Sequence, residues 1–392
     1  MTSLLSVDEA LGLILGRVRP LSAESIPLAE AAGRFLAEPA RAVVDLPPFP
    51  SSAMDGFALR AADAPGRLPV TARIAAGRPA PRPLAAGEAM GIATGGVVPE
   101  GADSVVPIEV VAEDGDVVDV PAVEAGAHVR PRGGDLSRGD AVVEARTLLR
   151  PAELAALAAA GVADVACARR PRAALVTTGT ELRRPGETLE PGQIFESNGV
   201  MLAAALASAG ALVELQDSVA DDERAHRDAL ERGLEADVLV TSGGVSVGPH
   251  DLVRPIEAEL GVEEVFWRVA VKPGKPLSFG VRNATLVFGL PGNPVSSLVC
   301  FEVFVRPALL ALQGAREPGP HFDDGVLAKT ARRNAQRDEF LRARLTADGL
   351  EPLTGQESHM IARAAAADAL VLVPRGDGEL AAGSGVRYLV LR

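Results

Sequence analysis

Two lysines stand three residues apart in the stretch VKPGKP, at Lys272 and Lys275. The chain has 39 lysines and arginines, and only three of these are lysines, the third being Lys329. A lysine ammonium is a compact point charge on a flexible stem, whereas an arginine guanidinium is a planar fork. A site that grips a small oxyanion or a phosphate at one point can therefore need lysine. The alternative is a pair of solvated lysines in a Pro-Gly loop, and this stretch alone does not decide between the two.

Three glycine-containing loops each follow a run of residues typical of a buried strand. Their sequences are TTGTEL, TSGGVS and GLPGNP, which start at Thr177, Thr241 and Gly289. Glycine lets a ligand approach the backbone closely, and free N–H groups at a following helix start favour anions. Three such loops together with VKPGKP indicate a crevice that handles a phosphate, although the chain has neither a Walker A loop nor G-x-G-x-x-G. The predicted binding residues in the loops are Thr178, Gly179, Ser242, Gly243, Gly244, Gly292 and Asn293.

Acidic side chains accompany the same loops. Glu181 lies in the first loop, Glu196 precedes a Ser-Asn pair at a predicted helix start, and Asp251 follows the stretch GVSVGPH. Carboxylates repel a phosphate unless a hard cation bridges them, and Mg²⁺ does this with one or two carboxylates and substrate oxygens. Each acid also has a structural alternative, because Asp251 suits the first turn of a helix and Glu196 suits a helix cap. The pattern therefore predicts Mg²⁺ as a cofactor and leaves these alternatives open.

Histidine and cysteine chemistry has no support in the pattern. The five histidines are scattered and lack a second ligand at helical spacing, which argues against a transition-metal site. No histidine stands near a candidate nucleophile, so a Ser-His or Cys-His triad has no basis. The two cysteines, Cys167 and Cys300, are too few for a disulfide framework, and Cys300 on an apolar helix fits a core position.

Strands and helices alternate from residue 172 onward and must position these loops. This alternation predicts an α/β fold with a mainly parallel, doubly wound sheet, in which ligands bind at the carboxyl ends of the strands. The glycine loops lie at those ends. The predicted strands are Ala173–Thr177, Leu212–Val219, Val238–Thr241, Val265–Val271 and Leu286–Leu290, and the predicted helices are Asn198–Ala209, Asp222–Glu235, one from about Pro249 and one from Pro294 to about Leu312.

Two β-rich segments and a helical segment complete the multidomain organisation. Ser6 to Glu9 reads as a capping box that opens a helix ending near Val18, and a second helix starts at Pro151 with Gly161 just past its end. The stretch between them is rich in Pro, Gly and short β-branched runs, so it forms a β-rich insert in a helical linker. We predict a helical linker domain at 1–44 plus 138–171, a β-rich inserted domain at 45–137, an α/β domain at 172–320 and a C-terminal β-rich domain at 321–392. The C-terminal domain is predicted to contain strands Leu341–Leu345, Leu370–Val373 and Val386–Leu391 around a helix near Ser358–Ala367.

The overall composition limits the kinds of partner expected for the protein and the cellular compartment in which it is expected. A net charge of −13 and a pI near 5.0 argue against nucleic acid or an anionic membrane as a partner, so an anionic substrate must meet a local positive site. The N-terminus lacks the pattern of a signal peptide, and we expect that no apolar run reaches membrane-spanning length, the nearest being Leu154–Ala168. A cytoplasmic protein is predicted.

Six motifs follow one another along the chain: PSSAMDGFAL, ATGGVVPEGAD, TTGTEL, TSGGVSVGPHD, VKPGKP and GLPGNPVS. In these motifs and their order the chain resembles the molybdopterin molybdenumtransferases, the family of the bacterial MoeA proteins and the gephyrin E domain. The resemblance runs from the N-terminal helix to the last strands. It implies an elongated helical linker, a β-rich insert, a molybdopterin-binding α/β domain and a C-terminal β-barrel-like domain, assembled as a homodimer. It also implies Mg²⁺-dependent insertion of molybdate into adenylylated molybdopterin with release of AMP, the final step of molybdenum cofactor biosynthesis, and possible contact with the molybdopterin adenylyltransferase.

The resemblance assigns roles to individual residues. Lys272 and Lys275 would hold the molybdate oxyanion or the phosphate of the pterin, and Glu181 and Asp251 would hold Mg²⁺. Relatives usually have Asp where this chain has Glu196, so the role of Glu196 stays open. Three residues that read as turns on their own, Asp55, Thr94 and Asp135, match positions that the partner subunit contributes to a composite site, and Arg337 in RDEF and Ser358 in GQESH correspond to a molybdate contact.

Two rival functions remain at this stage. The adenylyltransferase that makes the activated pterin shares the α/β domain alone, and its loop usually reads TSGGTG where this chain has TSGGVS. A non-catalytic scaffold is the other rival, since the gephyrin E domain also anchors a receptor. A damaged paralogue would be expected to lose Glu181 or Asp251, and this chain has both.

Overall fold

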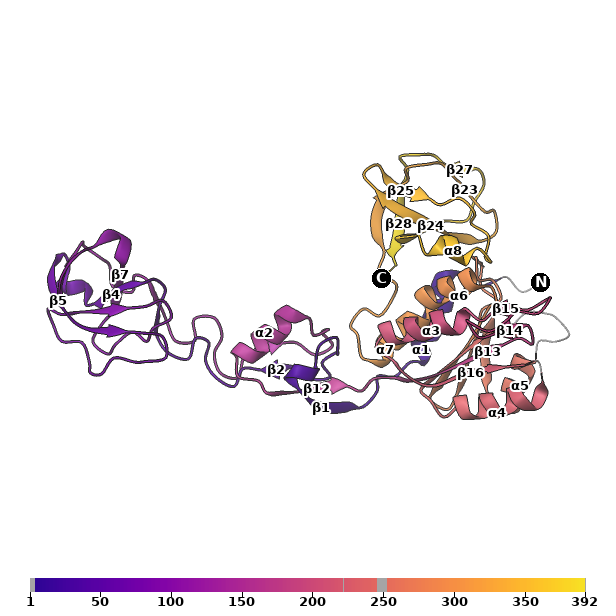
Figure 1. Ribbon diagram of the computed structural model, residues 1–392, viewed down its shortest axis with the longest axis horizontal. Helices are drawn as coiled ribbons and strands as arrows, with labels where there is room; N and C mark the ends of the chain where they lie inside the picture. Colours follow the sequence, from indigo (N-terminus) through magenta and orange to yellow (C-terminus); the bar gives the residue numbers. More distant parts are fainter. Residues whose placement is uncertain (1–3, 221, 245–251, 392) are drawn as a thin grey trace. The chain divides into compact units, whose positions relative to one another are not determined.

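The computed structural model describes residues 4–220, 222–244 and 252–391 (Figure 1). The chain divides into two compact units, and each is described by itself. The first unit contains residues 1–24, 33–35 and 168–392, and the second contains residues 25–32 and 36–167. The first unit therefore holds both the α/β sheet and the C-terminal β-rich module.

A six-stranded sheet with the strand order β16-β13-β17-β21-β20-β18 forms the centre of the first unit. The first four strands pair in parallel, β20 is antiparallel to β21, and β18 is antiparallel to β20. The direction of β18 is therefore the same as that of the four parallel strands, and the prediction of a mainly parallel sheet is confirmed. The bounds are Arg172–Thr178 for β13, Leu212–Val219 for β16, Val238–Ser242 for β17, Glu263–Trp267 for β18, Ser278–Arg282 for β20 and Thr285–Leu290 for β21.

Helices cover both faces of this sheet, as Figure 1 shows. Apolar residues of α1, α3 and α7 share one core cluster with inward residues of the strands, and those of α4 and α5 share a second cluster. The doubly wound prediction is thereby confirmed, and Cys300 is fully buried in the first cluster as predicted. The bounds are Val7–Arg17 for α1, Asn198–Ser208 for α3, Glu223–Gly233 for α4, Val253–Glu259 for α5, Pro294–Cys300 for α6 and Arg306–Leu312 for α7, with a π-turn at Phe301–Val305 between the last two.

The N-terminal helix belongs to the α/β core. Ser6 accepts a hydrogen bond from the Glu9 backbone and the Glu9 carboxylate accepts one from the Ser6 backbone, which confirms the capping box. Ala10 and Ile14 are fully buried among strand and helix residues of the α/β sheet. The predicted linker domain at 1–44 includes this helix, because an amphipathic pattern does not reveal which core its apolar face meets. The predicted domain boundaries remain predictions.

One helix has the length and composition of a membrane span. Pro294–Leu312 has 19 residues and a mean hydropathy of 1.8. The expectation that no apolar run reaches spanning length is therefore wrong. The helix is 72% buried inside the protein, because it packs against α3 and strand β21 in the first core cluster. Its apolar character is that of a core helix.

The predicted strand Val265–Val271 is two strands in two different sheets. Strand β18 ends at Trp267, and Arg268 has a positive φ of 79°, which breaks the extended run. Strand β19, Val271–Lys272, then pairs in parallel with β24 of the C-terminal module. The stretch VKPGKP thus starts in the sheet of the neighbouring module.

The C-terminal module is a sheet of order β19-β24-β26-β28-β22, with β25 paired to β24. Its own core contains Leu341, Ala343 and Val371 among other buried residues. The three predicted strands are confirmed, and the predicted helix shrinks to one turn, α8 at Ile361–Ala364. The bounds are Asp323–Val326 for β22, Asp338–Thr346 for β24, Gly349–Pro352 for β25, Ala369–Val373 for β26 and Gly385–Val390 for β28.

The second unit contains a six-stranded sheet of order β7-β4-β6-β5-β9-β8 and a separate small core. The small core joins α2 (Pro151–Ala159) to residues such as Leu36 and Cys167. The predicted helix start at Pro151 is confirmed, and Gly161 has the positive φ expected past a helix end. The strand bounds are Gly56–Leu59 for β4, Gly66–Ile74 for β5, Ala89–Ile92 for β6, Ser104–Pro107 for β7, Ala112–Asp114 for β8 and Val117–Val120 for β9.

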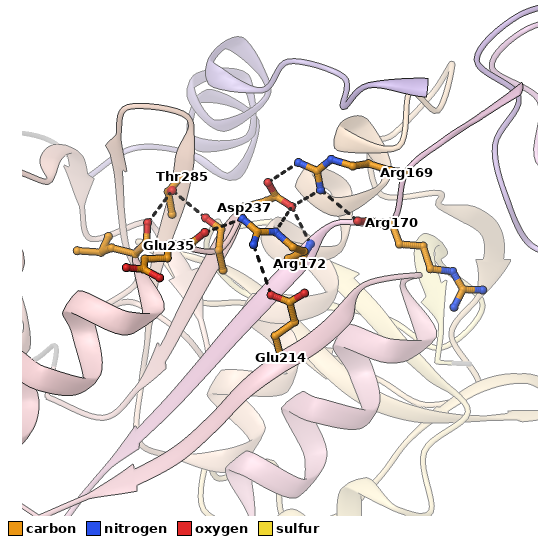
Figure 2. Close-up of polar contacts among 9 residues, drawn as sticks. Arg169, Arg170, Arg172, Glu214, Glu235, Asp237 and Thr285 are labelled. Carbon is orange, nitrogen blue, oxygen red and sulfur yellow. Dashed lines mark hydrogen bonds and ion pairs between the residues drawn. The ribbon is translucent and has the colours of Figure 1, made fainter. Parts of the chain in front are cut away.

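An arginine-carboxylate cluster closes the amino end of the α/β sheet, opposite the predicted crevice (Figure 2). Asp237 accepts two hydrogen bonds from the Arg169 guanidinium, at 2.6 and 2.7 Å, and one from the Arg172 backbone at 2.7 Å. Its own N–H and C=O pair with Arg172 and Leu286, at the starts of β13 and β21. Burial acts to raise the pKa of Asp237, but the hydrogen bonds from Arg169 and Arg172 outweigh it and hold the pKa below its ordinary value.

We expect Asp237→Asn to lower the stability of the first unit by about 1 to 3 kcal/mol at neutral pH, because a charge-assisted bidentate contact is lost. A depressed carboxyl pKa stabilises above the unfolded-state pKa, and this contribution disappears as pH falls through the folded-state pKa. The difference from wild type in thermal unfolding should therefore shrink on acidification below about pH 4. Glu214→Gln is the control, because Glu214 is half exposed and lies 3.6 Å from Arg172. An Asp237 effect that stays constant from pH 7 to pH 3 would contradict this assignment.

Candidate functional site

The three glycine loops leave the same edge of the sheet from neighbouring strands. Thr177 pairs with Ser242, and Ser242 pairs with Leu290, so the ends of β13, β17 and β21 are aligned. Trp267 at the end of β18 pairs with Ser278 of β20, which pairs with Gly289 of β21, so the end of β18 lies at the same edge. The segment that leads to VKPGKP therefore leaves at this edge too. The structure brings together at one edge the four loops that the sequence singled out.

Asn198, at the start of α3, ties the loops to one another. Its side-chain amide donates to the Ser242 hydroxyl at 2.9 Å and to the Gly292 carbonyl at 2.8 Å. Its Oδ1 atom is buried and has no hydrogen-bond partner in the described part of the chain. Asn198 was not among the predicted site residues, although it stands in the Ser-Asn pair after Glu196, because its contacts join segments far apart in sequence.

The glycines of these loops allow contacts that a side chain would block. A Cβ atom on Gly243 would lie 2.6 Å from the Thr178 hydroxyl, and Gly243 has a φ of 98°. A Cβ on Gly292 would lie 3.7 Å from the Cα of Gly243. The predicted binding residues Thr178, Gly243 and Gly292 are thus packed together. Gly244 has a φ of 65° and lies against Val253 of α5.

A pocket of about 570 Å³ lies beside this edge, between VKPGKP and the C-terminal module. The turn at 291–293 contributes to it from the α/β sheet, and the loop at 356–359 contributes from the C-terminal module. Five residues predicted from sequence line this one pocket: Lys272, Lys275, Asn293, Arg337 and Ser358. They come from four stretches of the chain, each more than 15 residues from the next.

Two cations line the pocket together with Glu357 and have no ion-pair partner among the described residues. Within the described residues, the side chains of Lys275 and Arg337 make no hydrogen bond and no ion pair. The chain carries 13 more acids than bases, so unpaired cations that line one cavity are unusual here. Two positive charges beside a hydroxyl group, that of Ser358, are suited to a small oxyanion. The pocket is therefore the best candidate for anion binding.

Lys272 differs from Lys275 because it has a partner. Its ammonium lies 2.9 Å from the carboxylate of Glu339, whose side chain is 9% exposed. The pairing of β19 with β24 places the two residues side by side. Glu339 was not among the predicted site residues, and its only signal in the sequence is its position two residues after Arg337 in RDEF. Lys272 is thus held in a fixed direction at the pocket wall.

Glu181 is the predicted metal ligand that the structure describes. Its carboxylate oxygens approach Gly179 so closely that a Cβ there would lie 2.8 Å away. The carboxylate makes no hydrogen bond or ion pair with the residues the structure describes, so its oxygens are available to a hard cation. Asp251, the second predicted ligand, lies outside the described residues. Among those described, no three His, Cys, Asp or Glu side chains gather into a metal site.

Glu196 caps a helix. Its side chain accepts a hydrogen bond from the Gly199 backbone at 2.6 Å and is 9% exposed. This satisfies an N–H group of the first turn of α3, which is the alternative that the sequence left open. The same residue lines a separate pocket of about 490 Å³ with Thr177 and Gln216. Its role in binding a substrate stays a prediction.

The second unit brings two of its three predicted residues into contact. The Thr94 backbone donates to the Asp55 carboxylate at 2.6 Å. The pKa of Asp55 is lowered, chiefly by this hydrogen bond and then by the Thr94 side chain. Ser52 pairs with Gly95, Gly96 and Val129, so the stretches around Asp55, Thr94 and Arg130 converge. Asp135 is exposed further along, and in the described structure it has no hydrogen bond to Asp55 or Thr94.

Fold and site together define a multidomain α/β protein with a candidate oxyanion pocket beside the carboxyl edge of its sheet. Comparison with known proteins agrees. Residues 5–161 match the MoeA N-terminal region (domain I and II), residues 174–311 a probable molybdopterin binding domain, and residues 324–391 the MoeA C-terminal region (domain IV). The chain belongs to the MoeA family.

Curated relatives and solved structures extend over the whole chain. The chain is 37% identical to molybdopterin molybdenumtransferase 2 of Mycobacterium tuberculosis, over 97% of this chain and 98% of that protein. It is 32% identical to the molybdopterin molybdenumtransferase of Haemophilus influenzae, with 98% of both chains covered. A crystal structure of a MoeA protein from Pyrococcus horikoshii superposes with a TM-score of 0.83 at 30% identity, with 99% of both chains covered. The resemblance inferred from six motifs is confirmed.

Proposed function

We propose that this chain is a molybdopterin molybdenumtransferase that inserts molybdate into adenylylated molybdopterin and releases AMP. The observation that carries the proposal is the pocket in which Lys275 and Arg337 lie unpaired beside Ser358. Molybdate is a small tetrahedral oxyanion, and two cations with a hydroxyl donor suit it. The names of the relatives supply the molybdenum and the pterin, and the adenylylated form and AMP are the finer part of the proposal.

The chain's own residues act by positioning and by neutralising charge. Lys275 and Arg337 bind the oxyanion, while Glu339 keeps Lys272 directed at the pocket wall. The turn at Gly292 and Asn293 connects this pocket to the glycine loops, because Gly292 contacts both Asn198 and Gly243. The phosphoanhydride of the substrate would lie along those loops, where backbone N–H groups favour phosphate. Holding both substrates in place lowers the barrier without covalent catalysis by the protein.

Glu181 and Asp251 would hold Mg²⁺ beside the phosphates. A bound Mg²⁺ would neutralise charge on the phosphate oxygens as water cleaves the anhydride to AMP and the pterin phosphate. The sulfur ligands for molybdenum come from the dithiolene of the pterin, since Cys300 is buried in the core and Cys167 is fully buried too.

The proposal includes a homodimer with a composite site. Asp55 and Thr94, joined by a hydrogen bond, and Asp135 would reach the pocket of a second copy. A cytoplasmic location and contact with the adenylyltransferase belong to the same proposal. What supports them is the family resemblance and the convergence of the predicted loops in the second unit.

The function is tested by AMP release from adenylylated molybdopterin by the purified protein, with and without molybdate and Mg²⁺. We expect release that requires Mg²⁺ and is stimulated by molybdate, with molybdenum recovered on the pterin. Binding of the nucleotide without AMP release under any oxyanion would overturn the proposal.

Glu181→Gln should reduce AMP release at least about 100-fold at millimolar Mg²⁺, because an amide oxygen carries no charge to hold the cation. Raising the Mg²⁺ concentration should recover part of the rate. Glu317→Gln, at an exposed residue outside the pockets, is the control. A loss in Glu181→Gln that is independent of Mg²⁺ would show that the carboxylate serves another purpose.

A further inference from the structure

The loop at 355–360, which carries Ser358 into the pocket, is held by one buried arginine. Arg342 of β24 is 1% exposed and is among the largest fully buried side chains. Its guanidinium donates to the carbonyls of Met360 at 2.7 Å, Gly355 at 2.7 Å and Glu357 at 3.2 Å. The hydrogen bonds thus reach both ends and the middle of the loop that contains Ser358.

Gln356 secures the same loop against the same strand. Its Oε1 accepts from the Arg342 backbone at 3.0 Å, and its Nε2 donates to the carbonyls of Arg342 at 2.9 Å and Leu353 at 2.8 Å. On the other side, the Ser358 carbonyl accepts from the Val295 backbone in the first turn of α6. The loop is therefore fixed to the C-terminal module by side chains and to the α/β sheet by a backbone hydrogen bond.

A buried charge without an acid partner is costly, so its presence calls for a reason. Burial is the main cause that lowers the pKa of Arg342, and no carboxylate lies within salt-bridge distance of it among the described residues. Three carbonyls from different residues can be satisfied by the planar fork of arginine, whereas lysine offers one donor centre. The hydrogen bonds that compensate for the burial of Arg342 thus fix the conformation of one loop at the pocket.

We propose that Arg342 is a positioning residue of the oxyanion pocket that acts through Ser358, and that it shares this role with Gln356, which also lines the pocket. Arg342 does not line the pocket, so it sets the place of the Ser358 hydroxyl relative to Lys275 and Arg337. This inference rests on the proposed function, since it assigns the pocket to molybdate. It predicts that disturbing Arg342 weakens molybdate binding selectively.

The test compares Arg342→Lys with Arg344→Lys, which makes the same change two residues along the strand at an exposed arginine. We expect the molybdate KM of Arg342→Lys to rise about 10- to 100-fold. The KM for adenylylated molybdopterin and kcat at saturating molybdate should stay within about threefold of wild type, and Arg344→Lys should match wild type. An unchanged molybdate KM overturns the proposal, and so does a parallel loss in both substrates and kcat.

Gln356→Met gives a second variant in case Arg342→Lys folds poorly. Methionine keeps the size of glutamine and removes its hydrogen bonds, whereas glutamate would place a new charge beside the oxyanion. We expect a smaller but equally selective rise in the molybdate KM. If wild type itself shows no molybdate-dependent AMP release, the proposed function fails. If wild type is active and both variants behave like it, the proposed function stands and only the positioning role of Arg342 and Gln356 is overturned.

A double-mutant cycle separates positioning from general packing. If Arg342 acts through Ser358, then Arg342→Lys should change the molybdate KM little when Ser358 is already alanine. If the fold-increases in molybdate KM of the two single variants instead multiply in the double variant, Arg342 acts by another route and the proposal is overturned.

Discussion

Lys275→Met should abolish the stimulation of AMP release by molybdate, with a loss of at least about 100-fold in kcat/KM for molybdate. The Lys275 ammonium has no partner among the described residues and lines the pocket with Arg337, so its charge is available to the oxyanion. Methionine fills similar space without the charge. Thermal stability should stay near that of wild type, because no ion pair is broken. The measurement is the rate of AMP release over a range of molybdate concentrations.

Lys329→Met is the matched control. Lys329 is the third lysine of the chain, exposed and paired with Glu351 in the C-terminal module. An exposed pair contributes little to stability, and this residue does not line the pocket. The variant should keep its molybdate response. If Lys275→Met also keeps it, the lysine is a solvated loop residue and the pocket is not the oxyanion site.

Glu257→Gln should stabilise the first unit at pH 8 by several kcal/mol, since each unit of pKa difference is worth about 1.4 kcal/mol. Glu257 of α5 is 6% exposed, and its Oε1 atom has no hydrogen-bond partner in the described residues. It lines a cavity of about 320 Å³ with Ser278, whose hydroxyl is also unpaired there. Burial, and then the nearby Glu264, raise the pKa of Glu257 to about 8.

The sign of the pH dependence follows from this raised pKa. The folded protein holds a proton on Glu257 up to about pH 8, whereas the unfolded chain releases it above its ordinary carboxyl pKa of 4.5. Stability from this group is therefore present at low pH and is lost as pH rises through that window, by about 1.4 kcal/mol per pH unit. Urea unfolding between pH 5 and pH 8.5 should show this slope in wild type and in Glu231→Gln, an exposed control. A wild-type slope that persists in Glu257→Gln would contradict the assignment.

Local patterns in the sequence were sufficient to predict most elements of the α/β sheet. Ser6 and Glu9 form the predicted capping box, and strand Leu212–Val219 has the predicted bounds. The meeting of three loops at one edge follows from parallel strands alone, because their carboxyl ends lie together. These predictions depend on hydrogen bonds and periodicity within short stretches, which a single chain displays directly.

Long-range pairing is what the sequence could not reveal. The run Val265–Val271 is uniformly suited to a strand, and only the tertiary structure sends Val271 to pair with Asp338 in another sheet. Strand β20 was missed for a local reason: it forms a tight hairpin with β21, but its run is short and contains Gly280. The apolar length of Pro294–Leu312 was overlooked because Glu302 and Arg306 interrupt it, and these two pair with each other.

The candidate site likewise contains residues that local motifs predict and residues that only long-range contacts reveal. The family resemblance was sufficient to predict Lys275, Arg337 and Ser358, because each was matched to a family motif by its residue type. Glu339, Arg342 and Asn198 could not, because their roles lie in contacts between strands, loops and helices far apart in the chain. A buried arginine in a strand pattern looks the same in sequence as an exposed one, and Arg344 stands two positions away.

We propose that molybdate binds between VKPGKP and the C-terminal module. An anomalous difference map from crystals of the full chain soaked in tungstate or molybdate would locate the oxyanion directly. We expect one strong peak within hydrogen-bond distance of Lys275, Arg337 and Ser358, which disappears in Lys275→Met. A peak elsewhere on the chain, with this pocket empty at a saturating concentration of the oxyanion, would contradict it.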